Sequence, residues 1–148
     1  MIVEPTSMQK EQRLKIPTSG SDCIVISGYA SFETLGITSS IKGDEDSDLT
    51  AISYTAQVVI GPDWLDVRDV SPTVTRAGFL HNDSDEADAT GYKIKNCTWD
   101  TVGSPEPNTD NEMIRLIVDL DSRGGRKSNL LSLAYHVVAI GKLAGAVG

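Results

Sequence analysis

Strict alternation of apolar and polar side chains over residues 50–60 is the feature that most limits how this chain can fold. Apolar side chains recur there at every second position, namely Ile52, Tyr54, Ala56, Val58 and Ile60. Residues 113–121 repeat the pattern with Ile114, Leu116, Val118 and Leu120. Successive side chains of a β-strand point to opposite faces of a sheet, so this period of two indicates strands with one buried face.

The rest of the chain extends this pattern to an all-β fold. Further strands are expected at 22–33, 72–80, 90–99 and 129–141, with a weaker one at 36–42. The spacers are rich in Gly, Pro, Asn, Asp and Ser, at 42–48, 61–63, 81–88, 103–110 and 122–125. No amphipathic helical segment separates the strands. We therefore expect an antiparallel β-sandwich or jelly roll.

A chain of 148 residues is long enough for one good core and too short for two. Residues 1–20 differ from the rest, because Pro5 and Pro17 bracket a polar, basic segment. A capping pattern, Thr6-x-x-Gln9, could start a short helix there, but about ten residues are marginal for a helix in water. The expected organisation is an extended or partly helical N-terminal arm at 1–20 and a β-sandwich domain at 21–148.

The charge distribution argues against some partners. The formal net charge is −8, and residues 43–112 hold 15 acidic against four basic residues. Nucleic-acid binding requires clustered Lys and Arg, so a nucleic acid is not expected as a partner. The N-terminus lacks the apolar core of a signal peptide and no segment approaches membrane-spanning length, so no membrane partner is expected either.

Catalytic motifs are missing from the sequence. Its only histidines are His81, beside an acidic loop, and His136, inside the apolar run 129–141, where a structural role is expected. There is no nucleophile elbow, no zinc-protease motif and no phosphate-binding glycine loop. We expect a protein that is not an enzyme. A small hydrolase that uses scattered carboxylates is the enzymatic alternative.

Two acidic loops are the candidates for a metal site. Their alternating carboxylates are Asp44, Asp46, Asp48, Asp83, Asp85 and Asp88. The first loop begins like a calcium loop, but Leu49 replaces the turn glycine and Thr55 stands where a bidentate Glu is needed. The expectation is solvated acidic loops and no cofactor, with calcium as the alternative. Cys23 and Cys97 are expected to be free thiols, and no grouping suits zinc.

Apolar residues at the ends of the chain suggest contacts with other subunits. The run 129–141 is apolar on both faces, as in a strand covered on each side or covered on one side by another subunit. The candidate interface residues in the arm and the tail are Ile2, Val3, Leu14, Ile16, Leu143 and Val147. A homo-oligomer is therefore expected.

The segments 92–98, 113–119 and 132–141 resemble the closing strands of small β-sandwich domains in phage fibres and H-type lectins. Such domains often finish on an aromatic residue followed by Ala and Gly, here Tyr135, Ala139 and Gly141. The likeness covers about a third of the chain. It implies a β-sandwich and a trimeric habit. The tryptophan common on the last strand of H-type lectins is absent, and no sugar-binding residue carries over.

The overall layout is similar to the decoration or cement proteins of tailed-phage heads. These proteins combine a short arm, an acidic β domain and an apolar tail, clamp neighbouring capsid subunits and often form trimers. The resemblance implies a non-enzymatic virion structural protein that decorates a phage capsid or forms part of its tail or fibre. Its partners would be its own copies and other virion proteins, assembled in the host cytoplasm. The alternative is a carbohydrate-binding, lectin-like receptor-recognition module that binds a surface glycan.

Overall fold

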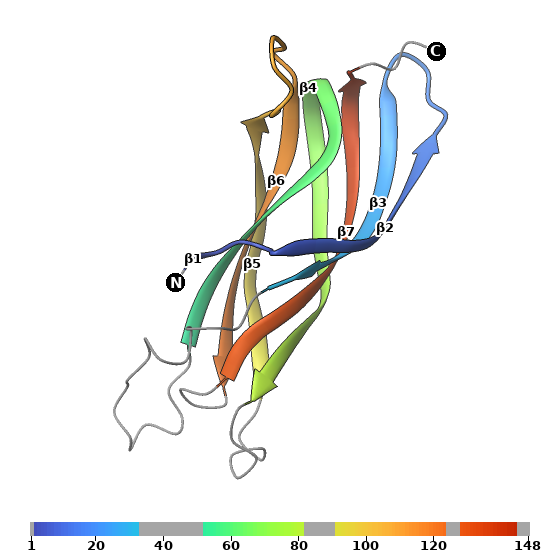
Figure 1. Ribbon diagram of the computed structural model, residues 1–148. Helices are drawn as coiled ribbons and strands as arrows, with labels where there is room; N and C mark the ends of the chain where they lie inside the picture. The colour runs from blue at the N-terminus through green and yellow to red at the C-terminus, as the bar shows by residue number, and fades with distance from the viewer. Residues whose placement is uncertain (1, 33–51, 82–90, 124–127, 145–148) are drawn as a thin grey trace.

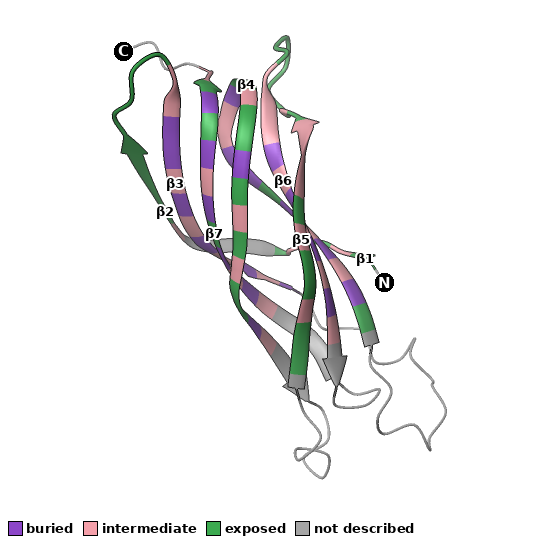
Figure 2. Ribbon diagram, turned by 180° about the vertical axis from the view of Figure 1, so that it is seen from behind, coloured by how far each residue is buried: buried purple, intermediate pink, exposed green. Residues whose placement is uncertain are grey.

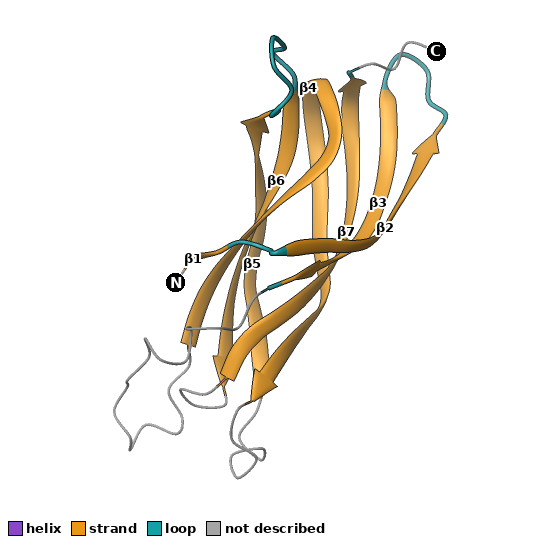
Figure 3. Cartoon of the chain, viewed as in Figure 1, coloured by secondary structure: helices purple, strands orange, loops and turns teal. Residues whose placement is uncertain are grey.

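Every regular element of the described chain is a β-strand (Figure 3). The computed structural model describes residues 2–32, 52–81, 91–123 and 128–144, and no helix occurs among them. The strands are β1 (Ile2–Val3), β2 (Ser7–Ile16), β3 (Asp22–Ser31), β4 (Ile52–His81), β5 (Gly91–Gly103), β6 (Glu112–Arg123) and β7 (Ser128–Leu143). They form one sheet in the order β2-β3-β7-β4-β6-β5, with antiparallel neighbours, and β1 pairs with β4 in parallel. The predicted all-β, antiparallel fold is confirmed.

The course of β4 turns this single sheet into a sandwich-like structure. A straight strand of its 30 residues would extend about 100 Å. Instead, residues 52–60 pair with β6, and the ladder to β7 runs from Trp64 to His81. Figure 1 shows β4 turning back at the upper end of the molecule. The spacer predicted at 61–63 therefore lies where β4 passes from one neighbour to the other.

Two half-sheets result, and their inner faces share one core. The first half-sheet comprises β1, residues 52–60 of β4, β6 and β5, and the second comprises β2, β3, β7 and residues 64–81 of β4. Buried and more exposed residues alternate along the strands (Figure 2). Both half-sheets contribute to one cluster of buried side chains, which includes Ile26, Val58, Leu116, Val137 and Trp64. The alternation at 50–60 and 113–121 thus marks the core-facing positions of β4 and β6.

Residues 2–3 and 7–16, near the start of the chain, take part in the sheet. β2 pairs with β3 from Ser7 opposite Ser31 to Ile16 opposite Cys23, and β1 lies beside β4 of the first half-sheet. Figure 1 shows this segment crossing from one half-sheet to the other. Residues 7–16 are extended throughout. The strand expected at 36–42 lies outside the described residues.

The predicted closing strands correspond to β5, β6 and β7. β5 continues to Gly103, beyond the predicted end at residue 99, and β6 and β7 run two or more residues past their predicted ends. Both cysteines are free, as the sequence predicts. Cys23 is 7% exposed but is not part of the core cluster, and Cys97 packs at the core's edge.

Candidate interaction surface

The outer face of the first half-sheet is mostly polar, and several of its charged side chains are paired. Asp121 accepts a hydrogen bond from the Ser53 hydroxyl at 2.8 Å, and Asp119 accepts one from Thr55 at 2.7 Å. Farther along, Arg115 donates to both oxygens of Asp100, at 2.8 and 2.5 Å. These hydrogen bonds from Arg115 lower the pKa of the Asp100 carboxyl below its ordinary value. These polar groups of the face therefore bind one another.

A shallow depression of about 430 Å³ lies on this polar face. It is lined by Ser53, Tyr54, Thr55, Lys95, Asn96, Asp119, Leu120 and Asp121. Both of its carboxylates already accept hydrogen bonds from neighbouring hydroxyls. Its aromatic residue, Tyr54, is 1% exposed. The depression thus offers polar groups but no exposed ring on which a sugar could stack.

The outer face of the second half-sheet has a different character. We use the name outer apolar face for six side chains that the strand register brings together, Leu14, Ile16, Cys23, Val25, Val138 and Ile140. One row across β2, β3 and β7 is Leu14–Val25–Val138, and the next is Ile16–Cys23–Ile140. Leu14 is 64% exposed, while Ile16 and Ile140 are each 37% exposed. Large apolar side chains in adjacent rows therefore face outward.

The third row of this half-sheet contains the histidine of the apolar run. His136 lies between Ser27 of β3 and Thr73 of β4. The structure places it on the exposed outer side, where Ser27 Oγ is 2.8 Å from its Nδ1. In the described part of the chain no carboxylate is hydrogen-bonded to this ring. A nucleophilic serine also needs hydrogen-bond donors for the developing oxyanion. The backbone amides that flank Ser27 belong to strand β3, which is paired with β7 in the sheet.

The predicted interface residues are divided among several places. Leu14 and Ile16 lie on the outer apolar face, while Ile2 is 67% exposed on β1 of the first half-sheet. Val3 and Leu143 pack against the core of their own chain. Val147 is outside the described residues.

Four residues of the outer apolar face were not among the predicted interface residues, namely Cys23, Val25, Val138 and Ile140. Two of them, Val138 and Ile140, lie in the run 129–141, whose apolar residues on both faces already indicated a covered outer side. The register between β3 and β7 is what joins them to Leu14 and Ile16.

None of the metal candidates can be placed. Asp44, Asp46, Asp48, Asp83, Asp85 and Asp88 all lie outside the described residues. Within the part of the chain that is described, no three His, Cys, Asp or Glu side chains come together in a way that could hold a metal ion.

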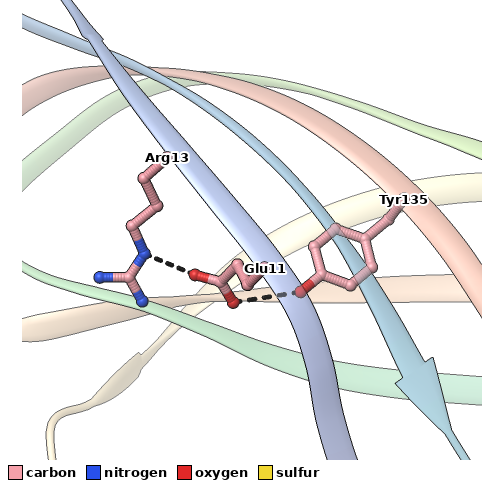
Figure 4. A network of polar contacts seen from close by, with 3 residues as sticks. All are labelled: Glu11, Arg13 and Tyr135. Carbon is pink, nitrogen blue, oxygen red and sulfur yellow. Dashed lines mark hydrogen bonds and ion pairs between the residues drawn. The ribbon is translucent and has the colours of Figure 1, made fainter.

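A polar contact joins β2 to a buried tyrosine of β7 (Figure 4). Tyr135 of β7 is 3% exposed, and its hydroxyl donates to Glu11 Oε2 at 3.2 Å. The other oxygen of Glu11 accepts from Arg13 Nε at 2.5 Å. The Tyr135 hydroxyl would contact a side chain added at Gly28 of β3, so the ring passes close to β3 on its way to β2. Burial, and then the negative charge and hydrogen bond of Glu11, raise the pKa of Tyr135 well above its ordinary value.

This raised pKa predicts a loss of stability in alkali. Below pH 10 Tyr135 is protonated in both the folded and the unfolded state. Above pH 10 the unfolded state ionises first, so this residue lowers the free energy of unfolding by up to about 1.4 kcal/mol per pH unit until the folded pKa is reached. Urea unfolding from pH 8 to 11 should show a steeper alkaline decline for the wild type than for Tyr135→Phe. Parallel declines would contradict the assignment.

No helix long and apolar enough to cross a membrane occurs among the described residues. Comparison of the chain with protein-family models, with curated proteins and with solved structures finds no match in any of the three.

Proposed function

We propose that this protein is a non-enzymatic structural subunit of a phage virion, where it decorates the capsid or forms part of the tail or fibre. The observation that carries the proposal is the outer apolar face, where Leu14, Ile16 and Ile140 are exposed in two adjacent rows. Contiguous apolar surface of this kind is typical of sites where proteins associate.

The chemistry of the described residues also favours an assembly role. The histidine–serine pair on the surface has neither an orienting carboxylate nor oxyanion donors, and the carboxylates of the polar face are engaged with Ser53, Thr55 and Arg115. A sandwich-like fold of this size agrees with the resemblance to small virion domains. The virion setting itself comes from that resemblance.

The role can be tested by locating the protein in assembled particles. Antibodies against the purified chain should detect it in density-gradient-purified particles from a host that carries the gene, and should label the particle surface in electron micrographs. Leu14→Asp should lower the amount incorporated, because a carboxylate on the outer apolar face would have to be buried in the contact. Val59→Asp is the control, since Val59 is 40% exposed but lies on the other half-sheet and is not among the predicted interface residues.

Point substitutions suit this test better than removal of the arm. Deleting residues 1–18 would remove β1 and β2 and uncover the edge of β3. Absence of the chain from particles would contradict the proposal. Binding of a glycan that is lost on Asn96→Ala, in the depression of the polar face, would favour the carbohydrate-binding alternative instead.

A further inference from the structure

The outward-facing positions of β2, β3 and β7 include the outer apolar face. None of them is a carboxylate, although the chain has 21 acidic residues. These positions are Gln12, Leu14, Ile16, Cys23, Val25, Ser27, Tyr29, Ser31, Ser132, Ala134, His136, Val138, Ile140 and Lys142. Lys142 at one border is the single full charge among them. On β4, Asp66 lies opposite Lys142, Asp69 opposite Ile140 and Arg76 opposite Ala134, and Arg68 pairs with Asp66. With β4 included, the face therefore has three basic and two acidic residues, and its charges nearly balance.

A neutral face is where two copies of an acidic chain can approach each other. With a net charge of −8, copies repel one another over most approaches. On this face the repulsion is least, and an identical face brings the same apolar rows and the same balanced border. A strongly charged partner would find little to pair with there. The charge pattern favours a second copy as the occupant.

The area also suits a stable pair. Four strands spaced about 4.8 Å apart, each with ten residues rising about 3.3 Å, cover roughly 600 Å² in projection. The accessible surface of a corrugated sheet exceeds its projection. A specific interface of standard size buries about 800 Å² of accessible surface on each partner. One such face is therefore large enough for a dimer.

Both outer strands of the sheet are protected against pairing edge to edge. β2 has a bulge between Gln9 and Gln12 and contains Lys10 and Lys15. β5 has a bulge between Ile94 and Asn96 and contains Lys93 and Lys95. Bulges and lysines on outer strands are devices that prevent strand addition. Residues 64–81 of β4 form the other border of the second half-sheet, and four register shifts interrupt their ladder with β7. Contact through a sheet face is therefore the favoured route to association.

We propose that a second copy of this chain packs on the outer apolar face, with the two copies related by a two-fold axis. The inference deepens the proposed function and rests on its assembly role. A single patch that meets its own copy gives a closed dimer, whereas a trimer needs two different patches. The two sheets would pack face to face, about 10 Å apart, as in the interior of a sandwich.

The test compares two matched substitutions in the full chain. Ile140→Asp places a carboxylate on the outer apolar face, and Val59→Asp places one on the polar face. Ile140 is 37% exposed and Val59 is 40% exposed, and both lie within paired strands. By light scattering and sedimentation velocity we expect a wild-type dimer. Ile140→Asp should raise its dissociation constant at least about 100-fold, and Val59→Asp should leave it within threefold.

Leu14→Asp is a second test variant that keeps the inference testable if Ile140→Asp does not fold. Leu14 is 64% exposed on an outer strand, so this variant should fold, as judged by circular dichroism, and should also be monomeric. A wild-type monomer or trimer would overturn the inference, as would a dimer that survives Ile140→Asp and Leu14→Asp. A monomer that still enters particles refutes the pairing alone. A dimer that is absent from particles refutes the virion role alone.

Discussion

Replacing Trp64 by alanine is expected to lower the free energy of unfolding by about 4 kcal/mol, the middle of the range for large core aromatics. Trp64 has 0% exposure and is the largest fully buried side chain described. It pairs with Glu112 of β6 and with Leu143 of β7, so it lies where β4 passes from the first half-sheet to the second. Removing the indole would leave a cavity at the junction of both half-sheets.

Trp64→Phe separates the packing of the ring from its polar group. The indole Nε1 is buried and has no hydrogen-bond partner among the described residues. Burying an N–H without a partner is unfavourable, and phenylalanine removes that group while it keeps most of the apolar volume. We expect Trp64→Phe to lower the free energy of unfolding by about 1 kcal/mol, well below the loss for alanine. Urea unfolding followed by far-ultraviolet circular dichroism measures both, and equal losses would contradict this account.

The sequence predicts the parts of this fold in which one face is buried. Residues 52–60 and 114–120 alternate because β4 and β6 each have a core side and a solvent side. β2 has no such pattern, because its outer position allows polar side chains and its bulge between Gln9 and Gln12 shifts the alternation. The same strand contains Leu14 and Ile16, which sequence reasoning selected as apolar residues outside the core.

The candidate surface was only partly predictable for a related reason. Leu14, Val25 and Val138 form one row only because β3 lies between β2 and β7. That order joins strands more than 100 residues apart, and no local period encodes it. The hydrogen bond between Glu11 and Tyr135 spans 124 residues of sequence and depends on the same order. The periodicity predicts which segments are strands, but it does not predict the order of those strands in the sheet.

Gly28→Ala is expected to lower the free energy of unfolding by about 2 to 3 kcal/mol, as overpacking of a full core does. A Cβ at Gly28 would lie 2.6 Å from Cζ of Tyr135 and would also contact its hydroxyl. The ring cannot easily yield, because it is buried and its hydroxyl is bound to Glu11. Gly103→Ala is the control, since an added Cβ there meets nothing within 4 Å. Its effect should stay within about 0.5 kcal/mol.

A double-mutant cycle with Tyr135→Leu tests the cause of this loss. Leucine is shorter than tyrosine, so it removes the atoms that the new Cβ of Gly28→Ala would meet. In that background Gly28→Ala should lower the free energy of unfolding by less than about 1 kcal/mol, which gives a coupling of about 2 kcal/mol. Additive losses in urea unfolding would mean that alanine at Gly28 disturbs the β3 backbone rather than the ring. In that case the close approach of Tyr135 to β3 would not be the reason why residue 28 must be glycine. The hydrogen bond between Tyr135 and Glu11 of β2 would then not depend on a glycine at that position.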